Sequence, residues 1–244
     1  MKQRLQKFLA IHGYGSRREI ERWIVAGRLS VNGEQATLGV KVDTTDRIQL
    51  DQKRLQFSKQ AFKRRVIIYN KPEGEVCTRS DTEGRKTVFD RLPVKNSERW
   101  IAVGRLDMNT SGLLMFTNDG ELANGLMHPS RKVDREYAVR INGEVTDEMI
   151  QKLKEGVLLE DGMARFTDVQ RGKDATGTNQ WFYVVLMEGR NREVRRLWEA
   201  MGVRVSRLKR VRYGNVFIPS RLKAGKYEEL SEKDVANLST LIDM

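Results

Sequence analysis

A single aspartate stands where an apolar stretch of the chain gives way to a polar loop. Residues 100–106 are mostly apolar and favour a buried strand, and Asp107 follows them directly, ahead of the loop at residues 108–112. A carboxylate at the end of a buried strand is held by a rigid element and can face a cleft, where it can act as a nucleophile. From local chemistry alone, the simpler interpretation is a turn cap, in which the side chain bonds to the following backbone.

Two further segments present side chains that suit substrate binding. Tyr137 lies in the strand-like run of residues 135–139, where a core tyrosine with a satisfied hydroxyl is the ordinary explanation. Arg190 and Arg192 precede a helical pattern, directly after a glycine. Arginines at a helix start can pair with phosphates or carboxylates, or can form only a solvated surface. The residues alone leave these alternatives open.

The composition argues against several other kinds of chemistry. The 244 residues include one cysteine, Cys77, and two histidines, His12 and His128, which lie far apart in the sequence and disfavour a zinc site. No Walker-type loop, dinucleotide fingerprint or nucleophile elbow occurs in the sequence. We interpret Cys77 as a partly buried structural thiol, and a single cysteine fits a reducing compartment. An enzyme of this composition would work with carboxylates, arginines, tyrosines and hydroxyls.

The charge of the chain indicates a polyanionic partner. The formal net charge is +12, and residues 1–65 carry 15 Lys and Arg against 6 Asp and Glu. Such a surplus favours nucleic acid over a membrane, although a basic surface can also serve solubility alone. Neither a signal peptide nor a transmembrane stretch is evident in the sequence, so we expect a cytoplasmic protein.

The N-terminal region predicts two helices. Apolar residues at helical spacing predict a first helix near residues 5–12. Ser16 and Glu19 have the form of a capping box at the start of a second helix, which is expected to end at Gly27. Four arginines lie outside the apolar face of this second helix, as an exposed surface or as phosphate ligands: Arg17, Arg18, Arg22 and Arg28.

A small sheet and a linker are expected next. Asn32-Gly33 between strand-like residues predicts a hairpin. Residues 40–42 and 47–50 are also strand-like, and residues 52–65 are polar and basic, as a linker would be. We therefore expect a compact N-terminal unit that ends before a domain boundary.

Beyond the linker, the pattern changes to many strands with few helices. The expected strands cover residues 66–69, 100–106, 113–116, 136–141 and 181–187. Short helices are expected from Asn118 to just before His128, and over residues 194–201. This order of elements favours an α+β fold with a largely antiparallel mixed sheet over a parallel doubly wound fold.

Three motifs, in their order and spacing, resemble the bacterial pseudouridine synthases that modify ribosomal RNA. They are GRLDMNTSGLLMFTNDGELANGLMHPS, REYAVR and EGRNREVRRLWEAMG. The resemblance covers nearly the whole chain, and it is to the branch with the small-subunit enzyme and the large-subunit enzymes B, E and F. The basic N-terminal unit resembles the S4-like RNA-binding domain found in part of this branch. The expected organisation is an S4-like domain at residues 1–60, a basic linker at 61–65 and a catalytic domain at 66–244.

The resemblance implies roles for individual residues. Asp107 matches the catalytic aspartate, and Tyr137 matches the tyrosine that stacks on the target base and is expected to assist deprotonation. Arg190 matches the basic residue expected to pair with the aspartate, and Arg192 is the substitute. The other residues expected to contact substrate are Arg105, which would fill the gap left by a flipped nucleotide, Leu197, in a segment that supplies an apolar wall, and Asn109 and Thr110 in the loop.

The implied reaction suits this set of side chains. Converting uridine to pseudouridine breaks a nitrogen–carbon glycosidic bond, turns the uracil and rejoins it through carbon, so the reaction calls for no redox cofactor or metal. Carboxylates also act in glycosidases, where the sugar develops positive charge. The aspartate must stay ionised in a cleft, and a paired arginine offsets the cost of burying its charge. Flipping the target base out of the RNA costs about a few kcal/mol, which stacking on the tyrosine would partly offset.

The resemblance also implies the partners. The expected substrate is a specific uridine of ribosomal RNA, in 23S RNA or in an assembly intermediate of the large subunit, and the protein is expected to be a monomer that needs no cofactor, metal or membrane. One alternative is a non-catalytic RNA-binding assembly factor that keeps the fold, although such a factor needs no carboxylate in a basic cleft. The other is a DNA-binding regulator, for which a dimerisation feature is missing.

Overall fold

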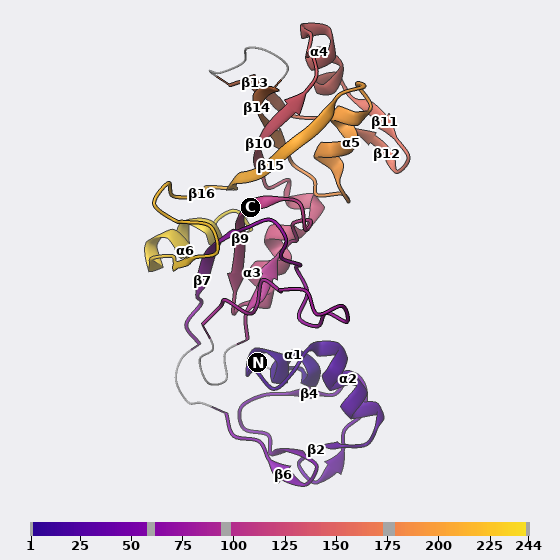
Figure 1. The fold of residues 1–244 in the computed structure, drawn as a ribbon. Helices are drawn as coiled ribbons and strands as arrows, with labels where there is room; N and C mark the ends of the chain where they lie inside the picture. Colours follow the sequence, from indigo (N-terminus) through magenta and orange to yellow (C-terminus); the bar gives the residue numbers. More distant parts are fainter. Residues whose placement is uncertain (1, 58–61, 94–98, 173–178, 243–244) are drawn as a thin grey trace. The chain divides into compact units, whose positions relative to one another are not determined.

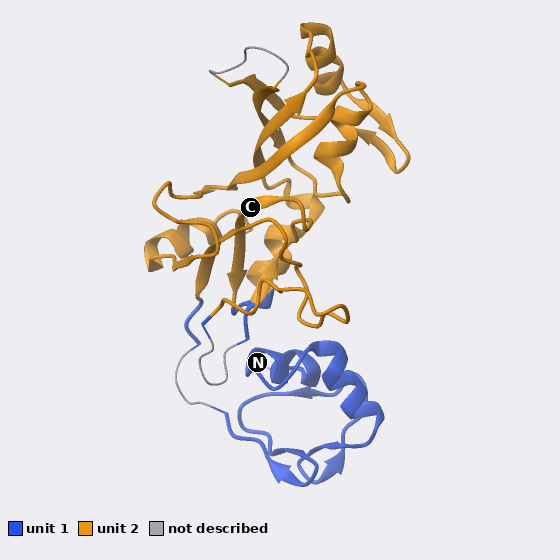
Figure 2. Cartoon of the chain, in the orientation of Figure 1, with its two compact units in different colours: residues 1–64, 93–100, 118–120 blue, residues 65–92, 101–117, 121–244 orange. Residues whose placement is uncertain are grey.

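The computed structural model describes residues 2–57, 62–93, 99–172 and 179–242, in two compact units (Figures 1 and 2). Unit 1 comprises Met1–Arg64, Pro93–Trp100 and Asn118–Gly120, and unit 2 comprises Arg65–Leu92, Ile101–Thr117 and Glu121–Met244. Within the described ranges, every helix is too short or too polar to cross a membrane.

Unit 1 has the two helices and the small strands expected from the sequence. Its elements are β1 (Gln3–Arg4), α1 (Leu5–Ile11), α2 (Arg17–Val25), β2 (Leu29–Val31), β3 (Glu34–Gln35), β4 (Lys41–Val42), β5 (Ile48–Leu50) and β6 (Lys53–Arg54). The strands form one sheet in the order β3-β2-β5-β6 and a second of β1 and β4. The core between helices and strands is apolar and fully buried at Leu5, Leu9, Ile20, Leu29 and Ile48.

Local signals account for the start of α2 and for the β2–β3 hairpin. The Glu19 amide donates to Ser16 Oγ and the Ser16 amide to Glu19 Oε2, both at 3.1 Å, which confirms the predicted capping box. Asn32 and Gly33 have φ of 56° and 94°, the left-handed pair that a tight two-residue hairpin requires.

The polar stretch of residues 52–65, interpreted as a linker, includes part of the sheet. Lys53 and Arg54 form β6 and pair with β5, because Asp51 and Gln52 make a tight turn with φ of 49° and 67°. These two turn residues lack the glycine that marks such turns in a sequence. Residues 58–61 of the predicted linker lie outside the described part of the chain.

Unit 2 is built on one mixed sheet of nine strands. In spatial order the main strands are β13 (Asp168–Arg171), β14 (Asn179–Leu186), β10 (Arg135–Asn142), β15 (Arg204–Tyr213), β9 (Ser111–Thr117), β7 (Val66–Lys71) and β17 (Tyr227–Glu229), with β8 (Ile101–Val103) on β9 and β16 (Val216–Phe217) on β15. Among these strands only β9 and β15 pair in parallel. The largely antiparallel α+β fold predicted from the sequence is therefore confirmed, although the strand expected over residues 100–106 is confined to β8.

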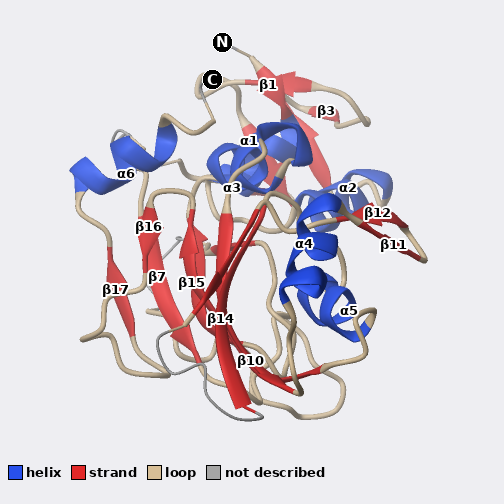
Figure 3. Ribbon diagram, turned by 90° about the horizontal axis from the view of Figure 1, so that it is seen from above, coloured by secondary structure: helices blue, strands red, loops and turns tan. Residues whose placement is uncertain are grey.

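Different helices pack on different strands of the sheet (Figures 1 and 3). The helical elements of unit 2 are α3 (Gly120–Met127), η1 (Pro129–Arg131), α4 (Asp147–Glu155), α5 (Glu193–Glu199) and α6 (Glu232–Ser239), and a short hairpin is formed by β11 (Val157–Leu159) and β12 (Gly162–Ala164). Helices α3 and α6 bury apolar residues against β7 and β9. Helix α5 lies on β14, where the fully buried rings of Phe182 and Trp198 are 5.1 Å apart.

Candidate active site

The site lies where the first residues of β9 meet the middle of β15. Gly112 pairs with Arg210 across this parallel contact, and Tyr137 of β10 pairs with Arg210 on its other side. Gly112 has φ of +100°, and a Cβ there would lie 2.2 Å from the carbonyl oxygen of Arg210, so only glycine allows this approach. Since strands are about 4.8 Å apart, Tyr137 lies about 10 Å across the sheet from Gly112.

Asp107 occupies the turn that leads into β9. The Thr110 amide donates to the Asp107 carbonyl at 3.0 Å and closes the turn. Lys71, at the end of β7, has 0% exposure, and its Nζ donates to the carbonyl oxygens of Pro72, Asp107 and Thr110 at 3.0, 3.1 and 2.9 Å. Burial lowers the pKa of Lys71, and the surrounding thiol and carboxyl groups, Asp107 among them, act in the opposite direction. The lysine therefore fixes both ends of the turn.

The Asp107 carboxylate itself is left available. Across the described residues it makes no hydrogen bond and no ion pair, although the side chain is only partly exposed. The structure therefore contradicts the interpretation of Asp107 as a turn cap, because backbone groups and Lys71 hold the turn. The charge of Asp107 instead acts electrostatically on Lys71 and on Arg195.

Arg195 is the arginine of α5 that reaches the aspartate turn. It is 6% exposed, its Nη2 donates to the Asn109 carbonyl at 2.8 Å, and its Nη1 donates to the Val205 carbonyl at 2.9 Å. Its Nε is buried and has no partner among the described residues. Burial and the neighbouring Arg192 lower the pKa of Arg195, whereas Asp107 raises it. Arg195 thus links α5, β15 and the Asp107 turn.

Sequence reasoning passed over Arg195, although a signal was present. Arg195 directly follows Val194 and precedes Trp198 by three residues, so it lies next to the apolar face of α5. A cation at such a position must be buried, and a buried cation requires dedicated partners.

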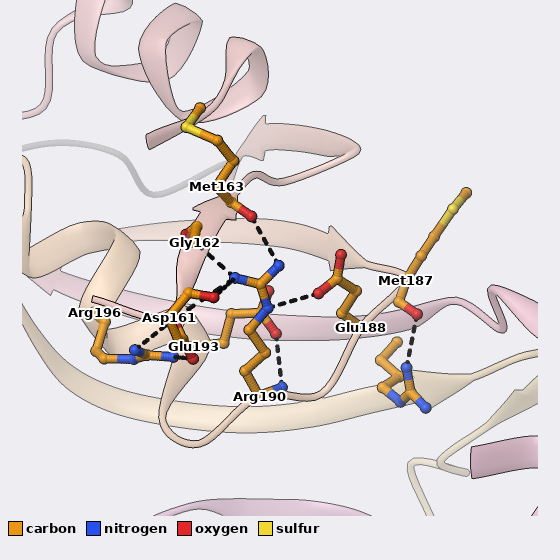
Figure 4. Close-up of polar contacts among 9 residues, drawn as sticks. Asp161, Gly162, Met163, Met187, Glu188, Arg190, Glu193 and Arg196 are labelled. Atoms are coloured by element: carbon orange, nitrogen blue, oxygen red, sulfur yellow. Dashed lines mark hydrogen bonds and ion pairs between the residues drawn. The ribbon is translucent and has the colours of Figure 1, made fainter. Parts of the chain in front are cut away.

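Arg190 is engaged elsewhere, and the structure here corrects the predicted pairing with Asp107 (Figure 4). Its Nε donates to Glu188 at 2.7 Å, and its Nη2 donates to the Met163 carbonyl at 2.8 Å. Its Nη1 reaches the carbonyls of Asp161 and Gly162 at 3.3 and 3.2 Å. The physical reason is that Arg190 precedes α5 and caps the turn between β11 and β12, where three carbonyl groups converge.

Arg196 binds the same turn between β11 and β12. Its guanidinium binds both carboxylate oxygens of Asp161 at 2.9 and 2.7 Å (Figure 4). The buried Glu193 accepts the Arg190 amide at 2.9 Å, and burial raises the pKa of Glu193. The substitute partner, Arg192, lies 3.8 Å from Glu199 and takes a left-handed φ of 49°. Both predicted arginines therefore hold protein groups other than Asp107.

The remaining predicted residues differ in exposure. Arg105 is exposed, two residues before Asp107, and Asn109 is exposed in the turn. Tyr137 is 8% exposed, and Leu197 is fully buried in the core beneath α5. Thr110 is 2% exposed, and its hydroxyl has no partner among the described residues. Their contacts with a substrate stay predictions.

Further polar contacts lie in the segments that follow β7 and precede Asp107. The Tyr69 hydroxyl donates to Glu75 at 2.5 Å, and Arg91 donates to the other Glu75 oxygen at 3.1 Å. The Leu106 amide donates to Cys77 Sγ at 3.4 Å, and burial raises the pKa of this thiol. A raised pKa keeps Cys77 a neutral thiol, in agreement with the structural role expected for it.

Of the four arginines predicted to bind RNA in unit 1, two line a depression and two do not, and one of the latter, Arg17, is exposed. Arg18 and Arg22 line a depression of about 1060 Å³ together with Arg4, which the sequence had not singled out. Arg28 is instead paired with the carboxylate of Asp51, and it does not line the depression. In the part of the chain that is described, no group of three His, Cys, Asp or Glu is placed to hold a metal ion.

Comparisons with known proteins agree with this architecture. A family model for RNA pseudouridylate synthase matches residues 65–200, and an S4 domain model matches residues 3–48. A Pseudomonas aeruginosa protein named ribosomal large subunit pseudouridine synthase B is 58% identical over 97% of this chain and 62% of its own length. A Vibrio cholerae protein of the same name is 56% identical over 100% of this chain and 76% of its own length.

A solved structure supports the fold independently. It is described as a pseudouridylate synthase and matches with a TM-score of 0.66 at 24% identity, covering 96% of this chain and 99% of the other. At that identity the likeness concerns the fold alone.

Proposed function

Because the chain belongs to the RNA pseudouridylate synthase family, we propose that it isomerises a specific uridine of ribosomal RNA to pseudouridine, with Asp107 as the essential carboxylate. The family model spans more than half of the chain, and the relatives named for the large ribosomal subunit align with nearly all of it. The chain spans 62% of the length of the Pseudomonas aeruginosa relative, so its substrate is part of the proposal. The expected RNA is 23S RNA, free or in a large-subunit assembly intermediate.

The observation that carries the proposal is that the Asp107 carboxylate accepts no hydrogen bond from any described residue, although the turn that carries it is held firmly. Lys71 and Arg195 together bind three carbonyl groups of the turn at Asp107, Asn109 and Thr110, but neither donates to the Asp107 carboxylate. A carboxylate that serves structure accepts hydrogen bonds from its neighbours, whereas a nucleophile or base must keep an oxygen free. Attack on the sugar, attack on the uracil ring and removal of a sugar proton all need this free, ionised group.

The surrounding residues have proposed roles in the same reaction. Arg195 replaces Arg190 as the cation that stabilises the aspartate, because it reaches the turn while Arg190 does not. Tyr137 is proposed to stack on the flipped uracil, and Arg105 to fill the gap that the base leaves. Base stacking on an aromatic ring contributes about 1–3 kcal/mol, which offsets part of the flipping cost.

RNA binding beyond the target base is assigned to unit 1. Arg4, Arg18 and Arg22 line a depression that can accept a phosphate backbone, and they outnumber the one carboxylate of its lining, Glu21. Arginine forks suit phosphate oxygens. The domain division proposed is an S4-like domain at residues 1–60, a linker at 61–65 and a catalytic domain at 66–244. We also propose that the protein is a monomer and acts in the cytoplasm, where its RNA is made.

One experiment tests the activity directly. Purified protein is incubated with unmodified 23S RNA fragments and with large-subunit assembly intermediates, and pseudouridine is mapped by carbodiimide modification and primer extension. We expect one modified position with the parent protein and none with Asp107→Asn, which should bind RNA normally. Failure of the parent protein on all substrates would refute the proposal, and turnover by Asp107→Asn would remove Asp107 from its role.

A further inference from the structure

One face of the sheet in unit 2, opposite the face that packs on α5, carries exposed and partly exposed aromatic and cationic side chains. Phe182 is fully buried beneath Trp198 of α5, whereas the next residue along β14, Tyr183, is 44% exposed. Because side chains alternate along a strand, Trp181 and Tyr183 share the face that points away from α5. Figure 3 shows α4 and α5 together on one side of these strands.

Cross-strand register places a cation directly beside Trp181 and another in the row of Tyr183, one strand further on. Arg140 of β10 is directly opposite Trp181 on one side and Arg207 of β15 on the other. In the neighbouring row, Ala138 lies between Tyr183 and Lys209. Arg204 pairs with Asn142 two residues beyond Arg140, so it belongs to the same face. We call Arg140, Trp181, Tyr183, Arg204, Arg207 and Lys209 the open sheet face.

The cations of the open sheet face are not neutralised by the protein. Among the described residues, Arg204, Arg207 and Lys209 have no carboxylate within ion-pair distance, and Arg140 Nε donates only to the Ser206 hydroxyl at 2.9 Å. Two carboxylates share this side of the sheet. Glu136 is ion-paired with Arg212 at 2.7 Å, whereas Asp168 accepts a hydrogen bond from the neutral Gln170 at 2.8 Å and keeps its charge, so the cations of this face outnumber the unpaired carboxylate. The face therefore presents a local positive field to solvent.

We propose that the open sheet face binds a single-stranded segment of RNA, separate from the nucleotide held at Asp107. Two residues along a strand span about 7 Å, so Trp181 and Tyr183 can each stack one base of an extended strand. The flanking cations then lie where the phosphates of that strand would run, as in other sheets that bind single strands. Duplex RNA would hide its bases from these rings, which makes the single strand the better occupant.

This inference rests on the proposed RNA partner, but its test does not need turnover. The probe is a fluorescein-labelled oligoadenylate of about twelve nucleotides, which has no uridine for the catalytic site. Binding is measured by fluorescence anisotropy over a range of salt concentrations, with the full chain carrying Arg18→Ala and Arg22→Ala so that unit 1 contributes less. Pseudouridine formation is followed separately on ribosomal RNA.

Two variants of the open sheet face are compared with two matched controls. Tyr183→Ala is matched by Tyr227→Ala, a 42% exposed tyrosine on the edge strand β17 at the far end of the sheet. The double variant Arg207→Ala, Lys209→Ala is matched by Lys152→Ala, Lys154→Ala, which removes two exposed cations from the last turn of α4. Thermal unfolding of every variant checks that the fold is kept.

The expected results are specific to the open sheet face. Tyr183→Ala should weaken oligoadenylate binding about fivefold or more, because a stacked base is lost. The double variant should reduce the slope of log affinity against log salt by about 1.4, since each cation on a single strand contributes about 0.7. The control variants should bind like the parent chain.

Two outcomes would overturn the proposal. One is that the open-face variants bind oligoadenylate no worse than their matched controls. The other is that the protein self-associates through this face, seen as a fall in sedimentation coefficient for Arg207→Ala, Lys209→Ala without RNA. If the parent protein formed no pseudouridine while oligoadenylate binding behaved as expected, the proposed function would be refuted, but the proposed RNA-binding role of the open sheet face would stand.

Discussion

Exchanging Arg195 for lysine should impair turnover far more than the same exchange at Arg190. Arg195 donates to the carbonyls of Asn109 and Val205 at 2.8 and 2.9 Å, and it is 6% exposed. Lysine keeps the charge, but a single Nζ on a shorter side chain replaces the two guanidinium nitrogens that each bind one of these carbonyls, so we expect at least one of the two contacts to be lost. Losing one charged hydrogen bond in a buried setting should cost about 1.5–3 kcal/mol of unfolding free energy.

The effect of Arg195→Lys on the reaction should be larger than its effect on stability suggests. The guanidinium holds the turn that carries Asp107 and places a positive charge beside the aspartate. Removing one preorganised electrostatic contact in an active site commonly costs about 3–4 kcal/mol in the transition state. Since 1.4 kcal/mol corresponds to tenfold in rate, the single-turnover rate should fall by about 100-fold or more.

Arg190→Lys is the matched control for this prediction. The side chain of Arg190 is 23% exposed and binds Glu188 and the β11–β12 turn, so its loss should cost about 1 kcal/mol of stability and change the rate only a few-fold. Both variants are assayed by single-turnover pseudouridine formation, with urea unfolding as the measure of stability. An inactive Arg190→Lys beside an active Arg195→Lys would refute the reasoning and restore the assignment made from the sequence.

Three further changes probe the close strand contact at Gly112, the buried Lys71 and the buried Glu193. Gly112→Ala should lower the unfolding free energy, measured in urea, by about 3 kcal/mol or more, because its Cβ would lie 2.2 Å from the Arg210 carbonyl oxygen. Gly84→Ala is the control: Gly84 has φ of +69° but open space around it, so the change should cost only about 1–2 kcal/mol. Lys71→Met leaves three carbonyls without their donor and should lower the unfolding free energy by about 3 kcal/mol or more, with turnover lost; normal turnover would contradict the support assigned to this lysine. Burial raises the pKa of Glu193 above its usual 4.5, so the stability tied to its proton is present below pH 4.5 and is lost as pH rises through the raised pKa. Glu193→Gln should therefore become more stable relative to the parent between pH 4 and pH 7, and an unchanged difference in urea unfolding would contradict this.

Short-range signals predicted the local structure of the chain well. Ser16 and Glu19 lie within one helical turn, and Asn32-Gly33 forms its hairpin from its own backbone preference, so neighbouring residues decide both features. The turn at Asp51 and Gln52 was missed because both residues adopt positive φ without being glycine.

The partners of the aspartate turn depended on contacts that no short pattern contains. Lys71 binds carbonyls 36 and 39 residues away, and carbonyl groups leave no trace in a sequence. Arg190 lies in the loop before α5 and Arg195 lies within the helix, and Arg192 between them has a left-handed backbone directly before the helix begins. The side chains before and after that residue therefore serve different partners, although five positions separate them in the sequence.

The parallel contact between β9 and β15 has a consequence for synthesis of the protein. Arg210 Nε donates to the Leu113 carbonyl across 97 residues of chain, and Arg195 reaches Asn109 across 86. A ribosome that has just released Asp107 from its exit tunnel has not yet made either arginine, so the turn forms without its closing partners. Contacts this distant in sequence form late because the intervening loop must be ordered first. Asp107 is thus made early, but the contacts around it form late, and a chain interrupted before β15 would carry the proposed catalytic aspartate without a site around it.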